Sequence, residues 1–313
     1  MDFSALELSE DAAFLDRARQ FLSANVTEEL LRREHQTGDG FIEELHLAMG
    51  AEGWLEPETK SAKDGGFRAV QRRIWDLERR RANVPLETWG GTIMILQAVR
   101  RYGSAELLDE VLAGVYRGEI RFAMGYTEPE GGSDIATCKT RAVRDGGGWV
   151  INGQKMFTSG AQNCQYVLLL TKTDPDGRRH RNLTMFLVPL DSAGIEIHGM
   201  RTVDGERTNV TYYSDVRIPD KDRLGEVDDG WRVLSGPLAA EHGAGGADPV
   251  GLADIATMSG FAATMARTAD RVFTSAVHDG SAAYRLGPAS ALPSDTEYLY
   301  RWAPLIGNLR RDH

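Results

Sequence analysis

The strongest constraint on the fold is a segment, residues 120–219, that has the pattern of strands without helices. It consists of short runs rich in β-branched and aromatic residues, separated by turn residues such as those at 146–148 and 174–177. No run with helical periodicity joins them, as it would in a parallel βαβ fold. Asn152-Gly153 is a favoured two-residue hairpin sequence because both residues tolerate positive φ. We therefore expect an antiparallel β-barrel or sandwich.

Apolar residues recur at helical spacing on both sides of this segment. Five such stripes precede it, and the last begins after Ser104 and ends at Gly118, which are typical N-cap and C-cap residues. Another helical stripe follows Gly230. These patterns predict an α+β chain with an N-terminal helical domain at 1–119, a middle β domain at 120–226 and a C-terminal helical domain at 227–313.

Composition argues against several classes of protein. Lys and Arg number 36 and Asp and Glu number 46, so the net charge is −10, which is unfavourable for binding nucleic acid or anionic membranes. No stretch reaches the roughly 18 apolar residues of a membrane-spanning helix. The N-terminal residues lack the features of a signal or transit peptide, so we expect a cytoplasmic protein. Cys138 and Cys164 form neither a disulfide framework nor a metal set, and we expect buried, reduced thiols and no metal.

The first motif is the run Tyr-Thr-Glu-Pro-Glu-Gly-Gly-Ser-Asp at 126–134. It has the pattern of a strand end that turns through a proline and two glycines. Such a turn exposes backbone N–H groups and lets a ligand approach the backbone closely. The hydroxyl of Ser133 adds a donor for a phosphate group. A polar β-turn with nothing bound is the alternative interpretation.

The second motif is the run Ile-Asn-Gly-Gln-Lys-Met-Phe-Thr-Ser-Gly at 151–160. We expect a hairpin here that places an aromatic ring before two hydroxyl groups. An aromatic ring can pack against a flat cofactor, and a neighbouring hydroxyl can hydrogen-bond to a ring nitrogen. The alternative is an ordinary hairpin whose Phe157 belongs to the core.

In this order and at this spacing, the two motifs resemble the acyl-CoA dehydrogenase family. Members of that family carry T-E-P-x-x-G-S-D followed by N-G-x-K-x-[W/F]-x-[T/S]. The resemblance continues through residues 204–210, 215–219, 224–226 and 230–231. It implies a protein that binds FAD and acts on an acyl-CoA thioester.

The resemblance also assigns roles to single residues of the first motif. Tyr126 and Thr127 occupy the positions that lie along the flavin ring. Gly132 and Ser133 occupy the positions that approach the FAD pyrophosphate, and Ser133 also lies near the CoA chain. These roles are carried over from the family by position.

The second motif carries over in the same way. Phe157 stands where many members have Trp, and is expected to pack on the flavin. Ser159 stands where many have Thr, and its hydroxyl is expected to bond flavin N5. Thr158 lies between them and is expected to contact the ring through its backbone.

The reaction implied by the resemblance is α,β-dehydrogenation of the thioester. A carboxylate removes the α-proton, the β-hydride passes to flavin N5, and an acceptor of the electron-transfer flavoprotein kind takes the electrons. Glu241 occupies one of the two places where members carry this base, so it is the catalytic candidate; His242 follows it where Arg is usual. A solvated helix glutamate is the alternative. Members with the base at this early place often take bulky acyl chains, so we expect a bulky or steroid-type thioester.

The C-terminal domain is short compared with the family. It lacks the R-x-x-F-G segment that reaches a neighbouring subunit's FAD, and the late segment that carries the other possible base. Two hypotheses follow. The chain is catalytic, with a homologous partner chain in a hetero-oligomer, or a second copy of itself, completing the FAD site; or it is a non-catalytic structural subunit that completes its partner's FAD site. A flavin oxidase or monooxygenase on the same scaffold remains a third possibility.

Overall fold

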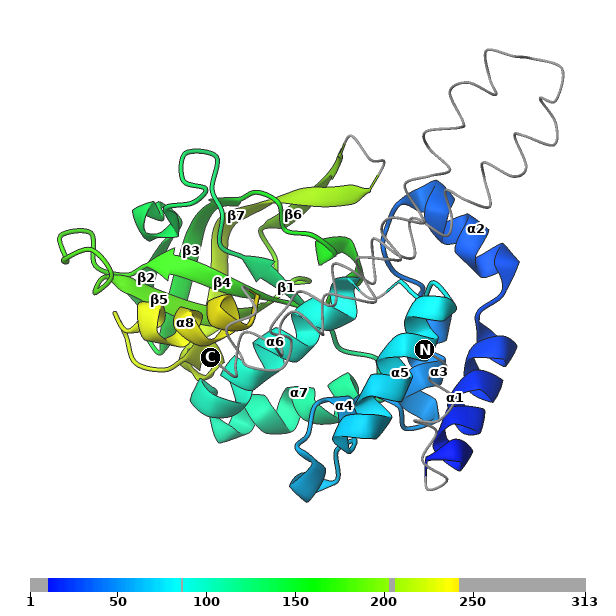
Figure 1. Cartoon of the computed structure of the whole chain (residues 1–313). Helices are drawn as coiled ribbons and strands as arrows, with labels where there is room; N and C mark the ends of the chain where they lie inside the picture. Colours follow the sequence, from blue (N-terminus) through cyan, green and yellow to red (C-terminus); the bar gives the residue numbers. More distant parts are fainter. Residues whose placement is uncertain (1–10, 86, 203–205, 242–313) are drawn as a thin grey trace, which may run out of the picture. The chain divides into compact units, whose positions relative to one another are not determined.

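The computed structural model describes residues 11–85, 87–202 and 206–241 (Figure 1). The helices in these ranges are α1 (Ala12–Asn25), α2 (Glu28–Thr37), α3 (Glu43–Ala51), α4 (Leu55–Glu58), α5 (Ala69–Arg81), α6 (Glu87–Tyr102), α7 (Ala105–Arg117) and α8 (Gly230–Glu241). The strands are β1 (Phe122–Gly125), β2 (Arg141–Asp145), β3 (Gly148–Lys155), β4 (Tyr166–Lys172), β5 (Leu183–Pro189), β6 (Ile195–Arg201), β7 (Arg207–Pro219) and β8 (Arg223–Leu224). This α+β succession of helices, strands and a further helix confirms the predicted fold class. None of the described helices combines the length and apolar character needed to cross a membrane.

The chain divides into two compact units. The first contains Met1–Trp75 and Val84–Glu241, and all the site geometry below belongs to its described residues. Of the second unit, the structure describes only Asp76–Asn83 at the end of α5, where Arg79 pairs with Asp76 at 2.5 Å. The domain boundaries at 119 and 226 stay a prediction.

The start, the end and the buried face of helix α7 follow from its local sequence. The Ser104 hydroxyl accepts a hydrogen bond from the backbone N–H of Leu107 at 3.1 Å, which caps the first turn. Gly118 ends the helix with φ 78°, a left-handed conformation that glycine adopts at little cost. Between these caps Leu107, Val111 and Val115 are buried. The predicted start, stop and core face of this helix are confirmed.

The strands form an eight-stranded sheet in the order β6-β7-β3-β2-β4-β5-β8, with β1 added beside β4. Most neighbours run antiparallel, as expected. However, β1 runs parallel to β4, pairing Phe122 with Tyr166, and β2 touches β4 in parallel at Arg141 and Lys172. Parallel strands need a long crossover connection. Here the turn after β1 and the β2–β3 hairpin form this connection. The sequence pattern did not indicate the parallel pairing.

The prediction of a hairpin turn at Asn152-Gly153 was wrong. Both residues lie inside β3, where the register with β7 shifts between Ile151 and Gly153. The turn lies instead between β2 and β3, at 146–147. A Cβ at Gly153 would come within 2.6 Å of the Thr140 backbone, so glycine is needed for close approach inside the sheet. The Asn-Gly pair is therefore a bulge signal here, and not a turn signal.

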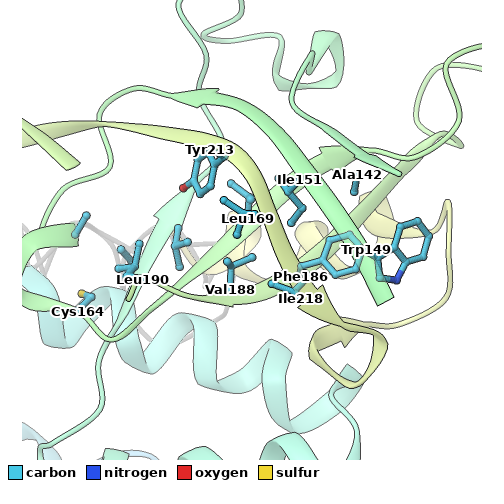
Figure 2. Packing of buried hydrophobic residues seen from close by; sticks show 14 residues of the cluster. Ala142, Trp149, Ile151, Cys164, Leu169, Phe186, Val188, Leu190, Tyr213 and Ile218 are labelled. Carbon is cyan, nitrogen blue, oxygen red and sulfur yellow. The ribbon is translucent and has the colours of Figure 1, made fainter. Parts of the chain in front are cut away.

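The core of the sheet explains the most apolar stretches of the sequence. Strands β4 and β5 are buried along almost their whole length, which is typical of strands covered on both faces. Side chains of other strands pack with those of β4 and β5 in one cluster. Helix α6 contacts β1, and α8 contacts β5 (Figure 1). Figure 2 shows the inner cluster, which includes Trp149, Ile151, Leu169, Phe186, Val188, Tyr213 and Ile218. The rings of Trp149 and Phe186 lie 5.3 Å apart.

Candidate functional site

The first motif continues directly from β1 and folds into a tight turn. Glu128 and Gly131 exchange two backbone hydrogen bonds, of 3.2 and 3.1 Å. A Cβ at Gly131 would come within 2.4 Å of the Thr137 hydroxyl, so a larger residue here would require the Thr137 side chain to move. The next two residues, Gly132 and Ser133, are exposed. A Cβ at Gly132 would meet no atom within 4 Å, so this glycine faces open space that a ligand can enter.

The second motif begins in β3 and leaves the sheet after Lys155. The next aromatic residue, Phe157, is 60 % exposed. Thr158 is buried, and Ser159 is exposed again. The interpretation of Phe157 as an ordinary core residue is therefore wrong, because its side chain lies at the surface.

The backbone of Phe157 is unusual. Its φ is 55°, in the left-handed region, which costs an L-residue roughly 1–2 kcal/mol relative to glycine. Bulky residues adopt this conformation rarely, and such strain is concentrated at functional sites. An exposed aromatic ring held in a strained conformation makes this segment a candidate ligand-binding surface.

Strand β7 supports the segment behind this ring. The backbone N–H of Thr158 donates to the Asn209 carbonyl at 3.0 Å, and the Asn209 amide donates back to the Thr158 carbonyl at 2.9 Å. The Ser159 hydroxyl lies 3.1 Å from that of Thr208. Asn209 therefore fixes the backbone on which Phe157 and Ser159 stand.

The structure brings the two motifs side by side. The backbone N–H of Met156 donates to the Thr127 carbonyl at 2.8 Å. Lys155 Nζ donates to the Tyr126 carbonyl at 3.2 Å. Tyr126 and Thr127 thus lie next to the segment that leads into Phe157, although 28 residues separate Thr127 from Lys155 in sequence.

A buried ion pair lies at this junction, and the sequence analysis assigned no role to its two residues. Lys155 is fully buried, Glu128 is 8 % exposed, and Lys155 Nζ lies 2.8 Å from Glu128 Oε1. Burial raises the pKa of Glu128, but the charge and hydrogen bond of Lys155, with hydrogen bonds from Thr140, outweigh it and bring the pKa to about 2. Glu128 is the glutamate of the first motif and Lys155 is the lysine of the second, so their place in the motifs was the sequence signal for a shared role.

The two cysteines are free and buried, as expected. Cys138 lies beside the ion pair, and burial raises the pKa of its thiol to about 11, so the neutral form is present. Burial raises the pKa of Cys164 to about 12. In the part of the chain that the structure describes, no group of His, Cys, Asp and Glu side chains is arranged to hold a metal ion.

Glu241 is the last residue of α8, and its side chain lies outside the described residues, as does all of His242. The start of α8 is set by close packing on β5. A Cβ at Gly230 would lie 2.8 Å from backbone atoms of Leu183 and Thr184. The structure thus anchors the helix that carries Glu241, whereas the role of Glu241 stays a prediction.

These residues fit a flavin dinucleotide. An outward-facing ring beside a hydroxyl suits a planar ring with hydrogen-bonding nitrogens. The open turn at Gly132 and Ser133 suits an anionic group that approaches backbone closely. Both features belong to the same unit and are connected through Glu128 and Lys155.

Comparisons with known proteins agree with this geometry. Residues 123–216 match the family model described as acyl-CoA dehydrogenase, middle domain. The acyl-CoA dehydrogenase FadE29 of Mycobacterium tuberculosis is 39% identical over 183 residues, covering 56% of this chain and 46% of that protein. FadE26 of the same organism is 34% identical over 214 residues, covering 67% and 53%. The chain therefore spans about half the length of these curated relatives.

Solved structures agree as well. The "Tcur3481-Tcur3483 steroid ACAD" superposes with a TM-score of 0.67 at 26% identity, covering 95% of this chain and 77% of that one. The ChsE4-ChsE5 complex from Mycobacterium tuberculosis gives a TM-score of 0.64 at 32% identity, covering 73% and 60%. Both names describe pairs of chains.

Proposed function

The chain is a member of the acyl-CoA dehydrogenase family through its middle domain, and from this premise we propose that it is an FAD-dependent subunit that dehydrogenates an acyl-CoA thioester at Cα and Cβ. The observation that carries the proposal is the junction of the two motifs. It places exposed Phe157, held at φ 55°, and exposed Ser159 next to Tyr126 and Thr127.

Each part of the site has a separate task in this proposal. Phe157 would pack on the flavin ring and the Ser159 hydroxyl would donate to it, while the Asn209 side chain holds the Thr158 backbone behind them. The turn at Gly132 and Ser133 holds the pyrophosphate. FAD, when bound, supplies the acceptor for the hydride.

Glu241 removes the α-proton in this proposal. It is the last residue of a helix whose start packs closely on β5. The thioester carbonyl must be polarised by hydrogen bonds for the α-proton to be acidic enough. The likeness to a protein that is named a steroid ACAD supports a bulky acyl group as the substrate class.

We also propose that a homologous partner chain completes the FAD site. Two related structures carry the names of two chains each, which supports a hetero-oligomer. In such an assembly the partner supplies the FAD contacts that the family draws from a neighbouring subunit. An electron acceptor of the electron-transfer flavoprotein kind then reoxidises the cofactor.

The first prediction tests cofactor binding and assembly together. The chain is purified alone and co-expressed with a homologous chain encoded beside it, and bound flavin is measured by absorbance. We expect little FAD on the chain alone and full occupancy in the complex. Full occupancy in an oligomer of this chain alone would contradict the partner, and absence of flavin from both preparations would contradict the cofactor.

Occupancy alone does not separate a catalytic chain from a structural one. The complex with Ser159→Ala in this chain is therefore compared with the complex that carries the equivalent Ala in the partner. If this chain holds the reacting flavin, its own Ser159→Ala slows flavin reduction by acyl-CoA, because N5 loses a donor. A slower reaction only with the partner's substitution would favour the structural-subunit interpretation.

The second prediction concerns the strain at Phe157. Phe157→Gly relieves the left-handed conformation, whereas Phe157→Ala removes the ring and keeps the strain. We expect the free energy of unfolding of Phe157→Gly to exceed that of Phe157→Ala by about 0.5–1 kcal/mol, because the larger conformational entropy that glycine loses on folding offsets part of the relieved strain. Both variants lose the ring, so both bind FAD more weakly than the wild type. Urea unfolding and flavin titration measure the two effects, and equal stability of the two variants would contradict the strain argument.

A further inference from the structure

We propose that the buried pair Glu128–Lys155, here named the clamp, is a positioning device that sets the spacing between the two motif segments and thereby shapes the flavin site. This inference rests on the proposed function, because FAD is the ligand whose ring and pyrophosphate the two segments would receive. The clamp itself lies beneath the surface and needs no contact with the cofactor. Its effect passes through the residues that follow it in sequence.

All three donors of the Lys155 ammonium are directed at the first motif and its loop. Nζ donates to the Tyr126 carbonyl at 3.2 Å, to Glu128 Oε1 at 2.8 Å and to Cys138 Sγ at 3.3 Å. An ammonium has three N–H groups, so these contacts account for each of them. Lys155 is also the last residue of β3. It therefore ties the point where the second motif leaves the sheet to the point where the first motif leaves β1.

The Glu128 carboxylate holds the other side. Its oxygens accept the backbone N–H of Lys139 at 2.7 Å and of Thr140 at 2.9 Å. Residues 129–138 thus form a loop closed at its base by one side chain, and this loop displays Gly132 and Ser133. Because the pKa of Glu128 is brought to about 2, the carboxylate is charged at neutral pH.

The position of the clamp indicates that it fixes the geometry of the two motif segments and does not only fill space in the core. Burying two charges is costly, and apolar residues of similar size often stabilise a core at least as well. A buried pair does, however, define one geometry, because a hydrogen-bonded ammonium and carboxylate tolerate little displacement. The neighbours of the pair are Thr127 on one side and Met156 on the other, which share a 2.8 Å backbone hydrogen bond. A shift at the clamp is therefore passed on within one or two residues to the ring-binding positions.

The matched control is Lys221. Its Nζ also joins two carboxylates, Glu110 at 2.6 Å and Asp222 at 2.7 Å, and Asp222 is almost fully buried. Lys221 lies after β7, outside both motifs. Lys155→Met and Lys221→Met thus remove the same charge from a paired ammonium, and only the first disturbs the clamp.

The experiment has one arm without cofactor. Amide hydrogen exchange is measured on the full apo chain of the wild type and both variants. We expect exchange at Met156, Lys139 and Thr140 to accelerate about tenfold or more in Lys155→Met, because their hydrogen bonds lose their support. We expect no such change in Lys221→Met, and strands β4 and β5 stay protected in all three. Unchanged exchange at these amides in Lys155→Met would overturn the clamp.

The second arm uses the FAD-loaded complex with the partner chain. We expect Lys155→Met to raise the dissociation constant of FAD about tenfold or more and to shift the flavin absorption band, whereas Lys221→Met changes neither. If Lys155→Met folds poorly, Glu128→Gln combined with Lys155→Met removes both charges and gives the same flavin readout. Wild-type affinity and an unshifted band in the folded double variant would overturn the proposal. A wild-type complex that binds no FAD would instead contradict the proposed function, and the exchange arm then decides whether the clamp exists.

Discussion

Glu241→Gln is expected to abolish reduction of the flavin by acyl-CoA and to leave FAD binding unchanged. The amide has the size of the carboxylate but cannot accept the α-proton, so the loss falls on the chemical step. Removal of a general base typically costs about 10²–10⁴-fold in rate. Because binding of the ground state is preserved, the substrate dissociation constant should change little.

The measurement is anaerobic mixing of the FAD-loaded complex with substrate, followed by the loss of flavin absorbance. The assay needs the complex, because an isolated chain without cofactor gives no signal in any variant. Glu226→Gln, an exposed position in the turn before α8, is the control and should reduce at the wild-type rate. A Glu241→Gln complex that bleaches at nearly the wild-type rate would place the base on another residue or on the partner chain.

Glu128→Gln is expected to destabilise the fold at neutral pH by about 3 kcal/mol or more, and by much less in acid. Removing one partner of a buried ion pair leaves the other charge uncompensated, which typically costs about 3–5 kcal/mol. The pKa of Glu128 is lowered from 4.5 to about 2, and a difference of that size corresponds to roughly 3 kcal/mol. The two arguments agree in magnitude.

The pH dependence follows from the direction of this shift. The pKa of Glu128 is lower in the folded state than in the unfolded one, so its contribution is present above about pH 4.5 and is lost as the pH falls toward 2. In strong acid the wild type also carries a neutral group at this position. The difference in unfolding free energy between wild type and Glu128→Gln should therefore shrink steadily below pH 4.5.

Urea unfolding at pH 7, 4 and 3 tests this expectation, because the two lower values lie between the pKa of Glu128 in the unfolded and in the folded state. The control is Glu130→Gln in the same turn, which removes an exposed ion pair with Lys139. Exposed pairs contribute little because solvent screens them. A Glu128→Gln effect that is the same at every pH, or no larger than that of Glu130→Gln, would show that the ion pair does not stabilise the fold.

Local chemistry made much of the fold readable from the sequence. Helix α7 could be predicted because a serine side chain caps its first turn and a glycine can adopt the φ that ends it. Strands β4 and β5 could be predicted because long apolar runs bounded by turn residues have few alternatives. The two motifs likewise pointed to the family, because their residue types and spacing are specific.

Features of the fold that depend on contacts between distant segments could not be predicted from the sequence. Asn152-Gly153 has the composition of a turn, but pairing of β3 with both β2 and β7 makes it a bulge inside a strand. Parallel pairing of β1 with β4 depends on where strands meet after a crossover, and no local pattern records that. The role of Glu241 stays a prediction, since its side chain lies outside the described residues.

The sequence by itself therefore determined the α+β class, the order of its elements and the candidate residues, since these depend on interactions between residues close in the chain. Only the tertiary structure decided that Phe157 is exposed and strained, and that Lys155 meets Glu128 in a buried pair. Burial and ion pairing depend on which segments pack together, because the cost of a buried charge is set by neighbours that can lie anywhere in the sequence.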